Sequence, residues 1–165
     1  MNRTLIALVE DKPGVLTRVA SLFRRRAFNI RSLTVGRTEQ RGVSRMTIVV
    51  DTDRTDVDKV AQNLLKLVNV IRVEDVTDEP AVTRNLALIK VQVNSGSRSE
   101  VMQIVDTFRA RVVDVGLDTL MIEVTGTDEK VEGLIEVLRT FGIAEMVRSG
   151  RIAMLRGNNG TGNKL

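Results

Sequence analysis

The chain has 165 residues, a net charge of +4 and a hydrophobic content of 42%. This length allows one domain or two small ones, and this much apolar sequence can form a core, which excludes the intrinsically disordered class. The absence of Cys and His excludes disulfides, thiol nucleophiles, imidazole bases and the usual zinc ligands.

The charge is segmental rather than uniformly basic. Residues 1–78 carry a net charge of +4, residues 79–147 carry −4, and residues 148–165 carry +4. Only four aromatic residues occur, all Phe, so few side chains could stack on nucleic-acid bases. No apolar run could span a bilayer, and the start of the chain lacks a signal-peptide pattern. We therefore expect a cytoplasmic protein that binds neither nucleic acid nor membrane.

The first half predicts the order strand, helix, strand, strand, helix, strand. An apolar strand ends at Val9, before an acidic turn and Pro13-Gly14. The helix that follows, over residues 13–26, carries one apolar face. Strands are predicted over residues 30–38, 43–50 and 70–76, with a second helix over residues 56–68 that Thr55 can cap. The apolar face of the first helix is predicted to consist of Leu16, Val19, Ala20, Phe23 and Ala27.

The same order recurs after a linker predicted at residues 79–84, next to Pro80. Strands are predicted over residues 86–93, 112–115, 120–125, 143–147 and 151–155. One helix begins with the capping-box pattern from Ser97 to Glu100, and a second begins at Thr127. The Gly- and Asn-rich tail, residues 157–165, is predicted to be disordered.

The repeated order predicts an α+β fold of two ferredoxin-like βαββαβ domains, at residues 1–78 and 85–156. Each domain would be an antiparallel sheet with two helices on one face. The other face and the sheet edges would be open, which favours oligomerisation.

The turn between Val9 and Leu16 is the first candidate site. A strand that enters a helix through a Pro-Gly turn leaves backbone N–H groups without partners at the positive end of the helix dipole. A carboxylate or phosphate can bind there, and Gly14 has no Cβ to hinder its approach. Alternatively, the turn is only a helix start, with Asp11 near the N-cap and Pro13 in the first turn.

A longer run that includes this turn resembles a known family. Residues 9–50 read VEDKPGVLTRVASLFRRRAFNIRSLTVGRTEQRGVSRMTIVV. This run is similar to the ACT domain at the start of the small, regulatory subunit of acetolactate synthase (acetohydroxyacid synthase). The resemblance continues in LKLVNV at residues 65–70, RNLALIKV at residues 84–91 and VRSGR at residues 147–151.

The resemblance implies a non-catalytic subunit. In this family the small subunit binds and activates a large, thiamine-diphosphate-dependent catalytic subunit. It also confers feedback inhibition by branched-chain amino acids, chiefly valine, in valine, leucine and isoleucine biosynthesis. Thiamine diphosphate, magnesium and FAD are expected on the large subunit only. The resemblance also implies a homodimer in which two ACT domains pair side by side.

The resemblance further assigns the effector site. Gly14 and Val15 would supply N–H groups for the effector carboxylate, and Asp11 would meet its ammonium group. Leu16 would line the side-chain pocket, although its helical spacing also suits plain core. Asn29 and Ile30 would come from the neighbouring protomer, although Asn29 could instead cap the turn before the next strand.

The corresponding turn of the second half, Asn94–Ser99, has no Pro-Gly pair and no acidic residue. We therefore predict an effector site in the N-terminal half only. Three alternatives stay open: a stand-alone ACT-type amino-acid sensor, a nucleic-acid-binding regulator suggested by Arg24–Arg26, and an enzyme. The last would need a carboxylate–lysine site.

Overall fold

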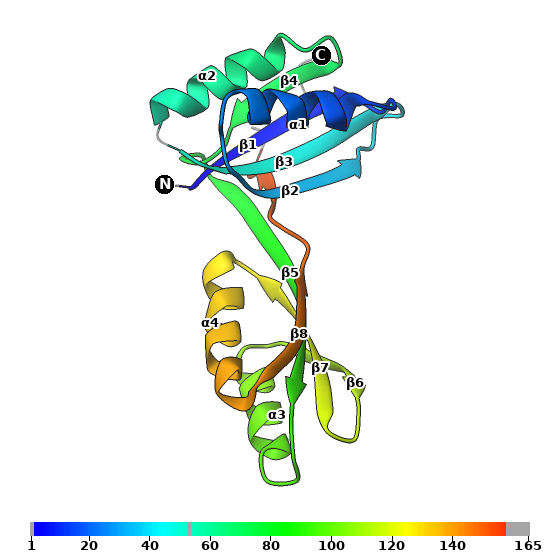
Figure 1. Cartoon of the computed structure of the whole chain (residues 1–165), viewed down its shortest axis with the longest axis vertical. Helices are drawn as coiled ribbons and strands as arrows, with labels where there is room; N and C mark the ends of the chain where they lie inside the picture. Colours follow the sequence, from blue (N-terminus) through cyan, green and yellow to red (C-terminus); the bar gives the residue numbers. More distant parts are fainter. Residues whose placement is uncertain (1, 53, 158–165) are drawn as a thin grey trace. The chain divides into compact units, whose positions relative to one another are not determined.

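The computed structural model describes residues 2–52 and 54–157, which form two units (Figure 1). The N-terminal unit contains residues 2–82 and 151–157, and the C-terminal unit contains residues 83–150. Both are sheet-and-helix units, so the predicted α+β class with two ferredoxin-like domains is confirmed. Residues 158–165 of the predicted disordered tail lie outside the described residues.

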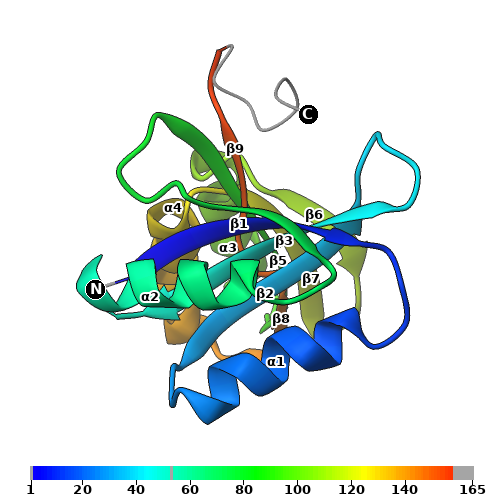
Figure 2. The same cartoon turned by 90° about the horizontal axis from the view of Figure 1, so that it is seen from above.

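The N-terminal unit has a four-stranded antiparallel sheet with the strand order β2-β3-β1-β4. Helices α1 and α2 cover one face of this sheet (Figure 1 and Figure 2). Because β2 is at the end of this order, one of its edges is open for further pairing. The elements are β1 (Asn2–Glu10), α1 (Val15–Arg25), β2 (Ile30–Arg37), β3 (Val43–Asp51), α2 (Arg54–Leu65) and β4 (Val70–Asp75).

The main core of this unit lies between the sheet and the two helices. Alternate residues of β1, Leu5, Ala7 and Val9, are buried there, as the period of two in a strand requires. The buried face of α1 differs from the predicted one. Val19 and Phe23 are buried as expected, but the face also contains Val15 and Leu22.

The predicted face of α1 was wrong at Leu16, Ala20 and Ala27. Leu16 and Ala20 are exposed, and Ala27 lies beyond the end of the helix. Both faces fit the helical period, but the observed face buries Leu22 where the predicted one would bury two alanines.

A second small cluster lies on the opposite side of β1, where strand β9 (Ile152–Leu155) packs. Ile6, Val76 and Ala153 are buried together, with Leu155 against them. The Arg45 guanidinium donates a 2.7 Å hydrogen bond to the carbonyl of Ala153. Nearby, the Arg151 guanidinium donates a 2.8 Å hydrogen bond to Thr4 Oγ1.

Strand β9 changes two predictions about the domains. Residues 151–156 were expected in the C-terminal domain but pack on the N-terminal unit. The predicted linker 79–84 is largely strand, because β5 begins at Ala81 and pairs with β9. The Arg156 amide also donates a 2.8 Å bond to the carbonyl of Pro80. The helix-free face of the N-terminal sheet is therefore partly covered, not open as predicted.

The C-terminal unit repeats the arrangement with the strand order β6-β7-β5-β8. Its core lies between the sheet and helices α3 and α4, and includes Ile89, Ile122, Leu134 and Leu138. Thr127 begins α4 as predicted, its hydroxyl accepting a 3.4 Å bond from the Lys130 amide. The elements are β5 (Ala81–Gln92), α3 (Arg98–Thr107), β6 (Arg111–Val115), β7 (Thr119–Gly126), α4 (Asp128–Leu138), the 3-10 turn η1 (Arg139–Phe141) and β8 (Ile143–Arg148).

Helices α1 and α3 end in the same way. Ala27 (φ 56°) and Arg109 (φ 52°) both adopt the left-handed conformation that favours glycine. Each helix closes with the paired backbone bonds of a Schellman motif. These bonds are Ala27 to Arg24 (3.2 Å) and Phe28 to Phe23 (3.1 Å) in α1, and Arg109 to Asp106 (3.0 Å) and Ala110 to Val105 (2.9 Å) in α3.

Candidate functional site

The β1–α1 loop, residues 10–14, connects the central strand of the N-terminal sheet to α1. Gly14 is the N-cap residue, with φ 85° and ψ −10°, a left-handed conformation that L side chains rarely adopt. A Cβ added at Gly14 would meet nothing within 4 Å, so the space beside its backbone is open. The loop therefore presents an accessible main chain at the start of α1.

The amides of this loop are only partly used. The Val15 amide donates to the Lys12 carbonyl at a long 3.4 Å, and the Arg18 amide donates to Gly14 at 3.1 Å. Within the part of the chain that the structure describes, no acceptor is found for the amides of Gly14, Leu16 and Thr17. These three donors lie at the positive end of the helix dipole, which suits an anion.

Asp11 is held beside this loop by the β2–β3 hairpin. Its amide donates a 2.8 Å bond to the carbonyl of Gly42. Its carboxylate lies 3.3 Å from Arg37 Nε, with 42% of the Asp11 side chain exposed. The alternative that Asp11 caps α1 is not supported, since its carboxylate turns to Arg37. An exposed ion pair of this kind is weak, so the carboxylate can exchange Arg37 for another cation.

Leu16 is 47% exposed, which contradicts its interpretation as a core residue. The plain-core alternative is wrong, because the neighbouring Val15 occupies the core position instead. Leu16 therefore presents apolar surface at the first turn of α1, next to the open amides.

Asn29 and Ile30 lie beyond the other end of α1. The helix has eleven residues, which span roughly 16 Å, so neither residue reaches the β1–α1 loop of the same chain. Asn29 is exposed and its carbonyl accepts a 3.3 Å bond from the Asp51 amide. Ile30 begins the edge strand β2 and packs partly against the core. The chain thus brings Asp11, Gly14, Val15 and Leu16 together, but not Asn29 and Ile30.

The sequence analysis missed a polar network behind the loop. Asn69, which is buried, donates from Nδ2 to Glu10 Oε2 at 2.9 Å and accepts a bond from the Arg18 guanidinium. Lys12 Nζ lies 2.8 Å from the same Glu10 oxygen. The hydrogen bonds from Lys12 and Asn69 lower the pKa of Glu10. Only the LVNV run at residues 67–70, which places an Asn before β4, hinted at this contact.

The β5–α3 loop of the C-terminal unit, residues 93–97, is built differently. Asn94 Oδ1 accepts 2.9 Å bonds from the amides of both Gly96 and Ser97. Ser97 is the N-cap residue of α3 as predicted, but its hydroxyl forms no capping bond and accepts a bond from the Asn94 amide instead. Of these two donors, only the Ser97 amide corresponds to one that the first loop leaves open, that of Gly14. The amides of Ser99 and Glu100 in the first turn of α3 have no acceptor in the described residues, as in the first turn of α1.

Two further observations concern other kinds of site. In the described residues, no group of three or more acidic side chains is arranged to hold a metal ion. Among the helices of the same residues, none combines the length and apolar character that crossing a bilayer requires.

Comparison with known proteins identifies the family of this chain. Residues 5–72 match the model of the AHAS small subunit-like ACT domain, and residues 84–157 match the model of the small subunit of acetolactate synthase. The acetolactate synthase small subunit of Mycobacterium bovis is 52% identical over 161 residues, covering 98% of this chain and 96% of that protein.

More distant organisms give the same result. The probable acetolactate synthase small subunit of Archaeoglobus fulgidus is 51% identical over 158 residues, covering 96% of this chain and 99% of that protein. The crystal structure of the small subunit from Thermotoga maritima superposes with a TM-score of 0.88 at 38% identity, covering 96% of this chain and 99% of that one. The chain therefore belongs to the acetolactate synthase small-subunit family.

Proposed function

We propose that this chain is the regulatory subunit that activates the catalytic large subunit of acetolactate synthase and makes it sensitive to branched-chain amino acids, chiefly valine. Membership of a small-subunit family implies a large catalytic partner. The observation that carries the effector proposal is the β1–α1 loop, with three open amides next to an accessible carboxylate.

The loop offers one complementary group for each part of an amino acid. The effector carboxylate would accept hydrogen bonds from the amides of Gly14, Leu16 and Thr17. The ammonium group would pair with Asp11, displacing Arg37 from a weak surface contact. The branched side chain would pack on the exposed part of Leu16. Compared with the sequence prediction, the Leu16 and Thr17 amides replace the Val15 amide, which is already engaged.

A second copy of the chain would complete the site. The open edge of β2 can pair with β2 of another protomer and extend the sheet. Such a homodimer would bring Asn29 and Ile30 of one protomer toward the β1–α1 loop of the other, which α1 prevents within one chain. A ligand at this junction can favour one arrangement of the dimer, and so alter a distant active site by linkage.

The catalytic chemistry belongs to the partner in this proposal. Thiamine diphosphate, magnesium and FAD would bind only the large subunit, in the cytoplasm, and the small subunit would hold no cofactor. No role for nucleic acid or membrane is proposed. The sequence without Cys and His suits such a division of labour.

Reconstitution tests the proposal. The purified chain is added to the large subunit of the same organism, and acetolactate formation is measured with and without valine, leucine or isoleucine. We expect activation by the chain and inhibition that depends on it, strongest with valine. Calorimetry on the isolated chain should give binding of the same amino acid. Amino-acid binding without activation or association would instead support the stand-alone ACT-type sensor.

A further inference from the structure

A basic groove runs between α1 and α2 on the helical face of the N-terminal unit. Two adjoining cavities of about 390 and 350 Å³ form it, and Arg25 and Leu67 line both. Its floor is apolar, with Leu22 buried and Leu67 half-buried. Its rim carries five cationic side chains: Arg18, Arg24, Arg25, Arg26 and Lys66.

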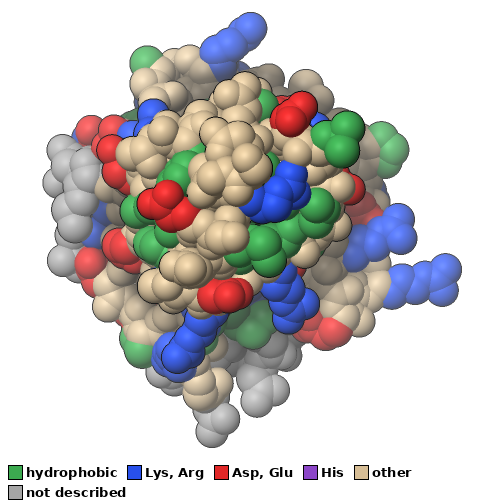
Figure 3. All heavy atoms as spheres, turned by 90° about the horizontal axis from the view of Figure 1, so that it is seen from below, with side chains coloured by type: hydrophobic (Ala, Val, Ile, Leu, Met, Phe, Trp, Pro, Cys, Tyr) green, Lys and Arg blue, Asp and Glu red, His purple; other side chains and the backbone are tan. Residues whose placement is uncertain are grey.

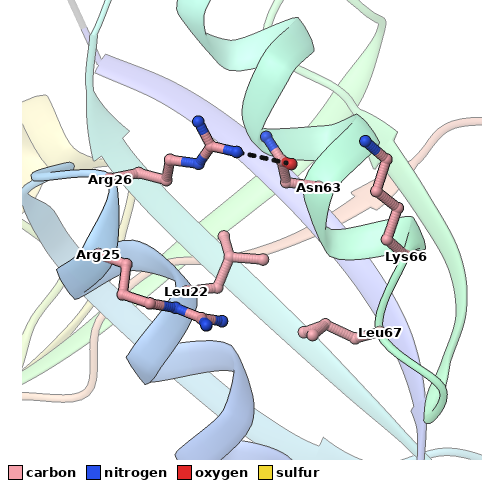
Figure 4. Close-up of a pocket in the computed structure, with 6 residues that line it drawn as sticks. All are labelled: Leu22, Arg25, Arg26, Asn63, Lys66 and Leu67. Carbon is pink, nitrogen blue, oxygen red and sulfur yellow. Dashed lines mark hydrogen bonds between the residues drawn. The ribbon is translucent and has the colours of Figure 1, made fainter.

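Figure 4 shows how the rim and floor of the first cavity are arranged. Arg25 and Arg26 lie at the end of α1, and Leu22 lies between their side chains. Lys66 and Leu67, which follow the end of α2, lie on the other side of the cavity. Arg26 Nη2 donates a 3.3 Å bond to Asn63 Oδ1 across the gap. The groove therefore has an apolar centre within reach of several positive charges.

The charge of the basic groove is not neutralised by the chain itself. No Asp or Glu lines either cavity. In the described part of the chain, none of the five rim cations forms a salt bridge, although Arg18 and Arg26 donate to asparagines. The sequence concentrates this charge, since residues 12–38 hold seven Lys or Arg and no acidic residue. By contrast, basic, acidic and hydrophobic side chains are interspersed on the face in Figure 3.

We propose that the basic groove docks an acidic amphipathic segment of the catalytic large subunit, an inference that rests on the proposed function. The lining runs along α1 from Thr17 to Arg26, about 14 Å, which suits a partner helix of some three turns. Its apolar residues would cover Leu22 and Leu67, while its carboxylates would meet the rim. Leu65 (50% exposed) and Val68 (88% exposed) flank the lining residues Lys66 and Leu67 in the sequence and add exposed apolar side chains to this segment.

A nucleic acid fits the same groove less well. The lining contains no aromatic side chain on which a base could stack. The apolar floor also forms no hydrogen bond or ion pair with a phosphate backbone. A protein segment uses both the floor and the rim. The groove also reaches the effector loop, because Arg18 is hydrogen-bonded through Asn69 to Glu10, and Glu10 pairs with Lys12.

Zero-length cross-linking tests the contact directly. A carbodiimide joins an amine to a carboxylate only where the two touch, so the assembled complex of this chain and the large subunit should yield a peptide in which Lys66 is linked to an Asp or Glu of the large subunit. The Lys66→Arg variant keeps the charge but removes the amine, and should lose this one cross-link while the other cross-links between the two subunits persist. A complex in which Lys66 reacts with no large-subunit carboxylate would contradict the proposal.

Charge reversal gives the energetic test. In Arg25→Glu/Lys66→Glu, the concentration needed for half-maximal activation of the large subunit should rise at least about tenfold, as expected for like charges at an interface. Arg84→Glu/Arg156→Glu makes the same change of net charge at exposed arginines outside the groove. It should change the concentration for half-maximal activation less than about twofold. Thermal unfolding and valine calorimetry on both variants report whether the fold and effector loop are intact.

The outcomes separate the two proposals. If the wild-type chain and the Arg25→Glu/Lys66→Glu variant activate the large subunit equally well, the docking proposal fails but the proposed regulatory function stands. A wild-type chain that neither binds nor activates the large subunit would overturn both. Tight binding of a DNA duplex at about 0.15 M salt that is lost in the variant, with normal large-subunit activation, would assign the groove to nucleic acid instead.

Discussion

The two loops that connect the first strand and first helix of each unit share a place in the fold but differ in their hydrogen bonds. In the β1–α1 loop, Gly14 provides no side chain and three amides have no acceptor in the described residues. In the β5–α3 loop, Asn94 accepts bonds from two amides with its own side chain. The repeat therefore preserves the scaffold, while the N-cap amide is bonded to Asn94 in the second loop and open in the first. The two free amides in the first turn of each helix do not distinguish the loops.

The largest effect should come from a carboxylate placed in the open loop. In Gly14→Asp, the new side chain would occupy the effector carboxylate's position and repel it, so the valine concentration for half-inhibition should rise more than about 100-fold. Activation of the large subunit should remain. Gly96→Asp places the same group in the C-terminal loop and should leave inhibition unchanged. Gly14→Ala reports the cost of backbone strain alone. If valine inhibition survives in Gly14→Asp, the effector does not bind at this loop.

Asp11 gives the next largest effect. Asp11→Ala removes the carboxylate proposed to meet the ammonium group, and valine affinity measured by calorimetry should fall roughly tenfold. Arg37→Ala removes the present partner of Asp11 and should change affinity less than about twofold. Equal losses in both variants would mean that Asp11 acts by anchoring the hairpin rather than by contacting the effector.

Asn94 should matter for stability rather than for binding. Asn94→Ala removes the acceptor of two amides at the start of α3, and the free energy of unfolding should fall by about 1 kcal/mol in urea. Asp11→Ala, at the corresponding loop, should cost less than about 0.5 kcal/mol because its carboxylate forms only an exposed pair. A larger loss from Asp11→Ala would show that the first loop is also capped from within.

The smallest effect should be a gain of stability shared by both units. Ala27→Gly and Arg109→Gly relieve the left-handed backbone at the ends of α1 and α3, and each should raise the free energy of unfolding by about 0.5–1 kcal/mol. Ala20→Gly, on the exposed face inside α1, should have the opposite sign. A loss of stability in Ala27→Gly would show that its methyl group contributes more than the strain costs.

Much of this fold follows from local patterns. The order of elements, the two repeats and the start of α4 at Thr127 were predicted because alternation, helical period and capping act over a few residues. The errors have a common cause in distant contacts. Strand β9 reads as a short apolar strand, but only Ile6 and Val76, about 80 residues or more away, decide which sheet it covers. The exposed position of Leu16 likewise depends on which of two helical faces packs better.

The candidate site was predicted in part for the same reason. The Pro13-Gly14 turn and Asp11 are visible in the sequence, since each acts through its own backbone or charge. The identity of the open amides needed the start of α1 at Val15, two residues later than expected. The contact between Asn69 and Glu10 joins residues 59 positions apart, so the local LVNV run could place an Asn before β4 but could not identify its partner.

The return of β9 makes the N-terminal unit a discontinuous domain, into which residues 83–150 are inserted. In engineering terms, a fragment that stops at residue 78 or 82 is not a complete N-terminal unit, because it exposes Ile6 and Val76 and leaves Arg45 without the carbonyl of Ala153. A better module deletes residues 83–150 and joins the flanking segments with a short flexible linker. The codons for residues 151–156 thus encode part of the first domain, and a nonsense mutation at codon 151 would damage the N-terminal unit while sparing residues 83–150.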